Sequence, residues 1–140
     1  MTKEVDIRIK GQQLGEEEDP VIMTASGTYH LTNGNHYIHY VEEVEGSDDI
    51  SKNTIKISSK RVILLKKGVQ NSQMIFDLQE EEQAIYQTSY GRLTMETDTR
   101  MIKLQETQDR IEVQMEYSLF ADGSKLSDNR LSIVIFARKE

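Results

Sequence analysis

The sequence predicts an all-β protein, a single antiparallel, mostly up-and-down barrel of about eight to ten strands. Three observations predict it: apolar and polar residues alternate, turn residues separate the alternating runs, and no segment has helical spacing. A period of two places one set of side chains on a buried sheet face and the other in water. The clearest run of apolar odd positions is Ile111, Val113, Met115, Tyr117 and Leu119.

Turn signals divide the chain into ten candidate strands. They span residues 5–14, 21–31, 37–44, 54–58, 62–67, 73–78, 84–90, 92–104, 110–120 and 126–137. The first strand ends at Gly15, where an acidic segment leads to Pro20, the only proline. Asn33 and Gly34 join the second strand to the third. Asn-Gly between alternating runs is the strongest short hairpin signal, because both residues must adopt positive φ.

The later strands are bounded by the same kinds of residue. Ser59 and Lys60 form the bend between the fourth and fifth strands, and Gly91 opens the long eighth strand. Asp122 and Gly123 make the turn between the ninth and tenth. Consecutive hairpins favour a meander over a Greek key.

A phase break in the eighth strand indicates a β-bulge. Leu93, Met95 and Met101 are apolar at odd positions, whereas Ile102 and Leu104 follow at even positions. A one-residue slip of this kind bends a strand. Long bent strands favour a closed barrel, with a β-sandwich as the alternative.

Length and composition limit the class of protein. At 140 residues the chain is expected to be one domain over residues 1–140. It has 0 Cys, which excludes disulfides, thiolate metal sites and cysteine nucleophiles. The charged N-terminus and the absence of a long apolar run predict a cytoplasmic protein that does not engage a membrane. A net charge of -7 also makes nucleic acid an unexpected partner.

The Asn33-Gly34 turn fixes a register for its hairpin, in which partner numbers sum to a constant. The resulting pairs are Leu31 with His36, Tyr29 with Ile38, Gly27 with Tyr40, and Ala25 with Glu42. Alternation then predicts that one face is buried, carrying Tyr29, Leu31, Ile38 and Tyr40. The opposite face carries Thr28, His30, Tyr37 and His39.

This register points the carboxylate of Glu42 inward, at the end of an apolar row. The next hairpin, turning at Ser59 and Lys60, places Asn53 opposite Lys66 and points Lys66 inward as well. A buried charge needs a partner, so Glu42 and Lys66 are a candidate interior pair. The alternative is that both only reach the rim of the barrel. Four further residues share inward parity and complete a candidate polar patch: Tyr40, Tyr86, Thr88 and Thr97.

Other chemistry is weakly signalled. His30 and His39 share the outer face diagonally, but no third metal ligand accompanies them, so we expect surface histidines and no metal or cofactor. The serines lack the context of a nucleophile, and the glycines do not form a phosphate-binding loop. An enzymatic role is therefore the third choice.

The succession of residues resembles the YwiB-like family of uncharacterised bacterial proteins over roughly residues 5–135. The residues that carry the resemblance are Gly27-Thr28-Tyr29, Tyr37-Ile38-His39-Tyr40-Val41-Glu42-Glu43, Thr54-Ile55-Lys56, Lys66-Lys67-Gly68, Met74, Phe76, Tyr86-Gln87-Thr88-Ser89-Tyr90-Gly91-Arg92-Leu93 and Thr97. The family is similar in fold to the calycins, the barrels that include lipocalins and fatty-acid-binding proteins. Its members carry no assigned activity, so the resemblance implies a fold and leaves the function open.

The resemblance also points to Glu42 and Lys66. The family's Tyr-x-Glu falls on Tyr40 and Glu42, and its Arg-x-Gly falls on Lys66 and Gly68. Lysine stands where the family pattern has arginine, which puts bidentate recognition of a carboxylate in doubt.

The sequence thus favours a barrel that binds a small, partly apolar ligand inside, with Tyr40, Glu42, Lys66, Tyr86, Thr88 and Thr97 at its polar end. The alternative is a protein-interaction or regulatory module with a packed barrel. The oligomeric state is left open.

Overall fold

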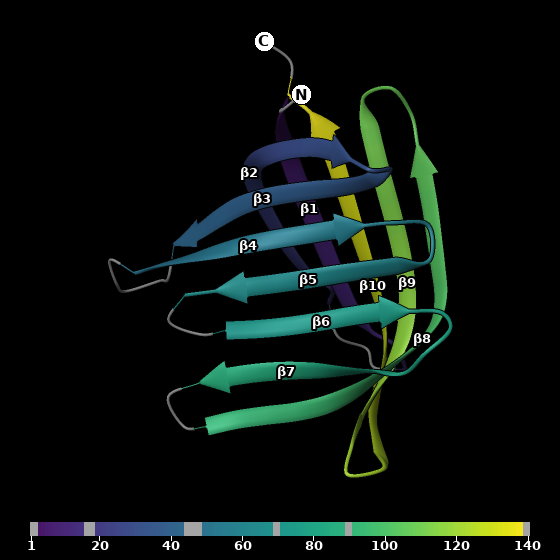
Figure 1. Cartoon of the computed structure of the whole chain (residues 1–140). Helices are drawn as coiled ribbons and strands as arrows, with labels where there is room; N and C mark the ends of the chain where they lie inside the picture. Colours follow the sequence, from purple (N-terminus) through teal and green to yellow (C-terminus); the bar gives the residue numbers. More distant parts are fainter. Residues whose placement is uncertain (1–2, 16–18, 44–48, 69–70, 89–90, 139–140) are drawn as a thin grey trace.

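The protein is a closed antiparallel barrel of ten strands in which each strand pairs with its neighbours in sequence and β1 pairs with β10 (Figure 1). The computed structural model describes residues 3–15, 19–43, 49–68, 71–88 and 91–138, and the side chains of all of these except 86–88. The strands are β1 (Lys3–Gln13), β2 (Val21–Thr32), β3 (Asn35–Glu43), β4 (Ile50–Ile57), β5 (Arg61–Lys67), β6 (Asn71–Asp77), β7 (Glu82–Thr88), β8 (Gly91–Glu106), β9 (Arg110–Ala121) and β10 (Ser124–Ala137). None of the described residues forms a helix long and apolar enough to cross a membrane. The predicted all-β, up-and-down barrel is confirmed, and the sandwich is excluded.

The acidic segments at 16–18 and 48 lie outside the described residues.

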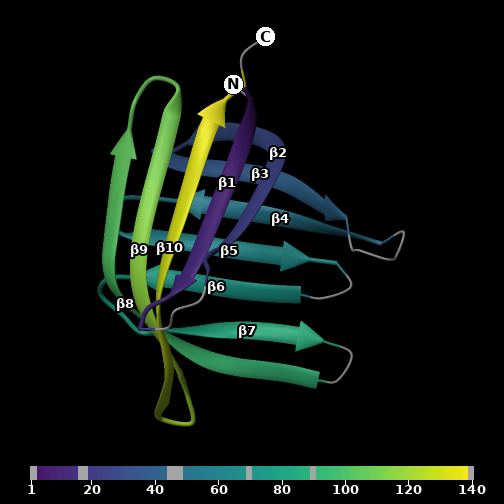
Figure 2. The ribbon, with the colours of Figure 1, turned by 180° about the vertical axis from the view of Figure 1, so that it is seen from behind.

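The strands form two layers that cross at a steep angle. β3 to β7 run across one side of the barrel, while β1, β9 and β10 run almost perpendicular to them on the other (Figures 1 and 2). β8 belongs to both layers, since it starts beside β7 and then bends to follow β9. The register between β8 and β9 shifts between Thr99 and Met101, so Arg100 occupies the predicted bulge. A bulge bends the strand that carries it, which here closes the barrel.

The predicted register of the β2–β3 hairpin is confirmed in part. Gly27 pairs with Tyr40 and Tyr29 with Ile38, and both turn residues have positive φ, 53° at Asn33 and 81° at Gly34. The described pairing ends at Gly27, however, so Glu42 does not face Ala25 and pairs instead with Ser51 of β4.

The predicted burial of the inward face of this hairpin is wrong for one residue. Ile38 and Tyr40 are buried and Tyr29 is half-buried, but Leu31 is 55% exposed. Leu31 lies beside the turn, at the end of the barrel, where it borders a hollow that is open to solvent.

The core fills the middle of the barrel. Its members come from strands on both layers and are all less than a tenth exposed: Val5, Ile7, Ile38, Tyr40, Ile55, Ile57, Val62, Phe76, Ile111, Val113, Met115, Leu131, Ile133 and Ile135. Because this middle layer is packed, space for a ligand is to be sought at the two ends of the barrel and on its outer face.

The join between β6 and β7 is the shortest in the barrel. Within the described part of the chain the two strands pair only through Asn71–Gln87, Ser72–Tyr86 and Gln73–Ile85, whereas the neighbouring β7–β8 pairing extends over the whole of β7. The second half of β6 therefore has no hydrogen-bonded partner on this side among the described residues.

Candidate functional site

A row of cross-strand partners crosses five strands near one end of the barrel, and its described side chains face inward. Cross-strand pairing connects Tyr40 to Asn53, Asn53 to Lys66, and Lys66 to Ser72, and the backbone of Ser72 pairs with Tyr86. The structure therefore places three of the sequence-predicted residues, Tyr40, Lys66 and Tyr86, in one row. We call this set, together with Glu42 in the next row, the rim site.

Glu42 and Lys66 approach each other at the rim, as the sequence predicts. Lys66 Nζ lies 3.5 Å from Glu42 Oε2, and the side chains are 36% and 33% exposed. This corresponds to the rim alternative and not to a fully buried pair. A contact of this length in partial solvent is a loose ion pair, which a charged group of a ligand can enter.

Tyr40 and its neighbours are the buried part of the rim site. Tyr40 is 8% exposed, Ser51 5% and Asn53 4%. Burial, with a smaller effect from the carboxylate of Glu42, raises the pKa of Tyr40 to about 12. The phenol is therefore neutral at physiological pH and available as a hydrogen-bond donor.

Thr97 is not brought to the rim site. Cross-strand pairing puts Leu93 of β8 opposite Tyr86, and Thr97 lies four residues further along β8. At a rise of about 3.3 Å per residue this separates Thr97 from the row by ~13 Å along the strand. The backbone of Thr88 pairs with Gly91, two residues beyond the row along β7. The side chains of Tyr86 and Thr88 lie outside those described.

Thr97 marks a second polar feature, deeper in the barrel. Thr97 is 1% exposed and Thr99 5%, and neither hydroxyl has a hydrogen-bond partner among the described residues. Buried hydroxyls without partners are uncommon and call for a water or ligand atom.

Three inward-facing apolar side chains beside the rim site remain partly accessible. Leu93 has the same parity as buried Thr97, yet it is 56% exposed. Leu64 and Met74, also inward-facing, are only half-buried. The row thus has charged and phenolic groups at its β3–β5 side and accessible apolar side chains towards β8.

The opposite end of the barrel carries a different polar group. The Tyr29 hydroxyl lies 2.7 Å from His36 Nδ1, and His36 Nε2 lies 2.5 Å from Glu106 Oε1. With Glu106 ionised, Nε2 donates to the carboxylate and Nδ1 accepts from Tyr29. The three side chains line a hollow of about 200 Å³. Burial, and secondarily the charge of Glu106, raises the pKa of Tyr29.

The other two histidines lie on the outer face, as predicted. The rings of His30 and His39 stack with centroids 5.4 Å apart. No group of His, Asp and Glu side chains suited to hold a metal ion occurs in the described part of the chain.

A ten-stranded closed meander with polar groups at its ends is consistent with the calycin-like barrels. The chain belongs to the family described as a domain of unknown function, DUF1934, whose model matches residues 7–133. It is similar to the crystal structure of the ywiB protein from Bacillus subtilis, with a TM-score of 0.82 at 17% identity over 99% of this chain and 94% of that one. At this identity the likeness establishes the fold alone. No protein in the curated set matches the chain.

The structure adds residues that the sequence reasoning did not select. Asn53 and Ser72 belong to the rim row, and the hairpin register that selected Lys66 already placed Asn53 opposite it. Glu106 gave no usable signal, because its partner His36 is 70 residues away on a strand to which it is not paired.

Proposed function

We propose that the protein is a non-enzymatic ligand-binding barrel that takes a small, partly apolar ligand at the rim site. A polar group of the ligand meets Lys66, Glu42 and the neutral phenol of Tyr40. Its apolar part lies along the inward-facing side chains of Leu64, Met74 and Leu93. Apolar walls with a few convergent polar groups are the usual composition of small-molecule sites.

The observation that carries this proposal is the combination of a loose ion pair with an accessible apolar side chain in one row. Glu42 and Lys66 are 3.5 Å apart and each about a third exposed. Leu93, in the same row as Lys66, is inward-facing yet 56% exposed. A barrel that served only as a packed scaffold would gain by covering this leucine.

The alternative is an interaction module whose interior takes no ligand. The packed middle of the barrel favours it, because a deeply inserted ligand would have to displace core side chains such as Ile38 and Phe76, both 0% exposed. The absence of cysteine fits a cytoplasmic setting for either function.

Two measurements test the rim site. Native mass spectrometry of protein purified from its own host should detect a retained small molecule. In parallel, the amphipathic anion 8-anilinonaphthalene-1-sulfonate serves as a probe, because its sulfonate suits Lys66 and its rings suit the apolar surface. We expect Lys66→Met to weaken binding of the dye by about tenfold, the equivalent of 1.4 kcal/mol.

Lys103→Met is the matched control, since Lys103 is an exposed residue of β8 next to inward-facing Ile102 and Leu104. Its dye affinity should equal that of the unchanged protein. Equal affinity of Lys66→Met and Lys103→Met, with no retained molecule, would move the interaction module to first place.

A further inference from the structure

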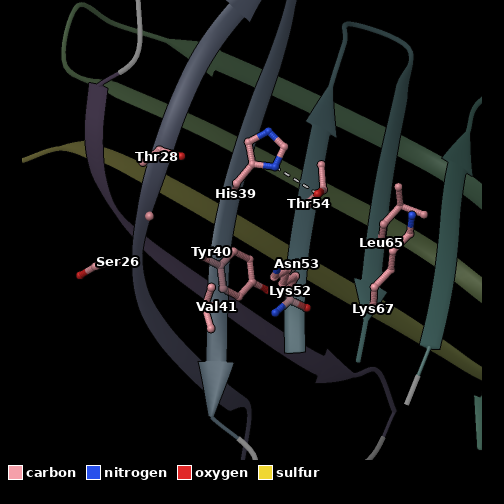
Figure 3. A pocket seen from close by; sticks show the side chains of 11 residues that line it. Ser26, Thr28, His39, Tyr40, Val41, Lys52, Asn53, Thr54, Leu65 and Lys67 are labelled. Atoms are coloured by element: carbon pink, nitrogen blue, oxygen red, sulfur yellow. Dashed lines mark hydrogen bonds between the residues drawn. The ribbon is translucent and has the colours of Figure 1, made fainter. Parts of the chain in front are cut away.

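The outer face of the barrel carries a trough over β2 to β5, on the far side of the sheet from the rim side chains (Figure 3). Its volume is about 560 Å³. Outward-facing side chains surround it in two rows, first Thr28, His39, Thr54 and Leu65, then Ser26, Val41, Lys52 and Lys67. The trough therefore combines hydroxyl groups, an imidazole, an apolar wall and two ammonium groups.

Two lysines are cross-strand partners at the end of this trough. Lys52 of β4 and Lys67 of β5 are directly paired in the sheet, and both side chains are exposed. Like charges at opposite positions of an antiparallel pair destabilise the sheet. Neither lysine has an ion-pair partner among the described residues, although the chain as a whole carries a net charge of -7. Glu43, the outward carboxylate one row further along β3, pairs in the sheet with Ile50 and makes no ion pair with either lysine.

Aromatic rings form a ladder that ends at the trough. Tyr37 and His30 stack with centroids 5.1 Å apart, and His30 and His39 stack at 5.4 Å. The Nζ of Lys56 lies 5.5 Å from the centroid of Tyr37 and covers the other end of the ladder. His39 Nδ1 lies 3.1 Å from Thr54 Oγ1, which fixes the plane of the ring. One face of His39 is thus taken by His30, and His39 itself lines the trough.

We propose that this trough binds a free nucleotide, with the base extending the ladder at His39 and the phosphate between Lys52 and Lys67. The Lys52 row is two residues from the His39 row, about 6.6 Å along the strands, which suits a planar ring and an anionic group joined by a sugar. The hydroxyls of Thr28, Thr54 and Ser26 provide hydrogen-bonding groups for that sugar. The chain's net negative charge opposes a long polyanion, so a single nucleotide fits better than a nucleic-acid strand. This inference is independent of the rim site.

Isothermal titration with adenosine 5′-monophosphate tests the proposal, with adenosine and inorganic phosphate as partial ligands. The monophosphate should bind at least about tenfold more tightly than either part, because each part retains only one of the two anchors. Lys52→Gln and Lys67→Gln should each weaken its binding about fivefold or more, and His39→Ala by a similar factor, while His39→Phe keeps the stacking and restores affinity.

Lys103→Gln and Lys10→Gln are matched removals of exposed lysines outside the trough, and both should leave the affinity unchanged. Lys52→Gln should also raise the urea midpoint at low salt, since it relieves the repulsion from Lys67. The proposal is overturned if the monophosphate does not bind, or if the trough variants bind it as well as the controls. A short oligoadenylate that binds far more tightly than the monophosphate would replace the free nucleotide by a single strand as the ligand.

Discussion

His36 and Glu106 connect opposite sides of the barrel. They lie on β3 and β8, which have four strands between them whichever way the barrel is followed, yet Nε2 and Oε1 are 2.5 Å apart. His36 is 8% exposed, and Tyr29 completes the chain at Nδ1. One imidazole thus closes this end of the barrel by hydrogen bonding across it.

Tyr29→Phe should lower the free energy of unfolding by about 1–2 kcal/mol, because it leaves the buried Nδ1 of His36 without a donor. Glu106→Gln should cost less than about 1 kcal/mol, since half of the Glu106 side chain is in solvent, which screens the charge. Urea unfolding measures both. Tyr37→Phe is the control, as its hydroxyl has no hydrogen bond within the described residues, and it should stay within about 0.5 kcal/mol of the unchanged protein. Equal losses of unfolding free energy for Tyr29→Phe and Tyr37→Phe would show that the hydrogen bond between Tyr29 and His36 does not contribute to stability.

Glu42 and Lys66 should couple weakly. The double-mutant cycle of Glu42→Gln and Lys66→Met should give an interaction energy of at most about 1 kcal/mol, the range of partly exposed ion pairs. Raising the salt concentration should reduce it further. A coupling of about 3 kcal/mol or more would mean that the pair is buried in solution and not at the rim.

Two glycine substitutions in β-strands should have opposite effects. A Cβ at Gly27 would lie 2.2 Å from the carbonyl oxygen of His39, so Gly27→Ala must push β2 and β3 apart and should cost about 1–3 kcal/mol. A Cβ at Gly11 would meet only Leu131 Cδ1, at 3.7 Å. Gly11→Ala should therefore be neutral or stabilising by up to about 1 kcal/mol, because it restricts the unfolded chain. Thermal unfolding of both variants decides, and a Gly27→Ala protein as stable as Gly11→Ala would contradict the close approach of the two strands.

Asp128 should make stability sensitive to acid. Its hydrogen bond from Ser118, and then its contacts with Lys125 and Arg100, lower the pKa from 3.8 to about 2. A pKa that is lower in the folded state stabilises the fold above pH 3.8, and this contribution disappears as the pH falls towards 2. The urea midpoints of the unchanged protein and Asp128→Asn should differ at neutral pH and converge across this window. A difference that persists at the acidic end would assign the effect to packing instead of charge.

Tyr40 should make stability sensitive to alkali. Its pKa is raised from 10.0 to about 12, so the neutral phenol favours the folded state below pH 10, and this contribution is lost as the pH rises through 10 to 12. The unfolding midpoint of Tyr40→Phe should decline less over this range than that of the unchanged protein. Parallel declines would show that Tyr40 ionises as freely in the fold as in the unfolded chain.

Local sequence patterns were sufficient to predict the fold, because hydrophobic alternation and turn residues determine the structure of a few neighbouring residues at a time. Asn33 and Gly34 determine the β2–β3 register, and the shift from odd to even apolar positions locates the bulge at Arg100. The burial of Leu31 was predicted wrongly because alternation identifies a face but not where the barrel stops covering it.

The candidate sites were harder to predict from the sequence, because they depend on which strands lie next to each other in the barrel. The proximity of Glu42 and Lys66 could be predicted, because two hairpin registers point both side chains inward. Thr97 shares their parity, but it lies too far along β8 to reach the rim site. The opposition of Lys52 and Lys67 was contained in the same hairpin register that selected Lys66. The trough that these lysines border depends on the curvature of the sheet, which no local pattern encodes.

The short join between β6 and β7 gives the molecule a preferred line of opening. A closed barrel presents no free strand edge, and breaking it anywhere creates two. Separation costs least where the fewest backbone hydrogen bonds hold the strands, and among the described residues the fewest paired positions lie between Asn71–Gln73 and Ile85–Gln87. An opening along this line would expose the interior next to the rim site and would create two free strand edges, through which two copies could pair. The hydrogen-exchange rates of the backbone amides in β7 therefore measure how often the barrel opens at this join.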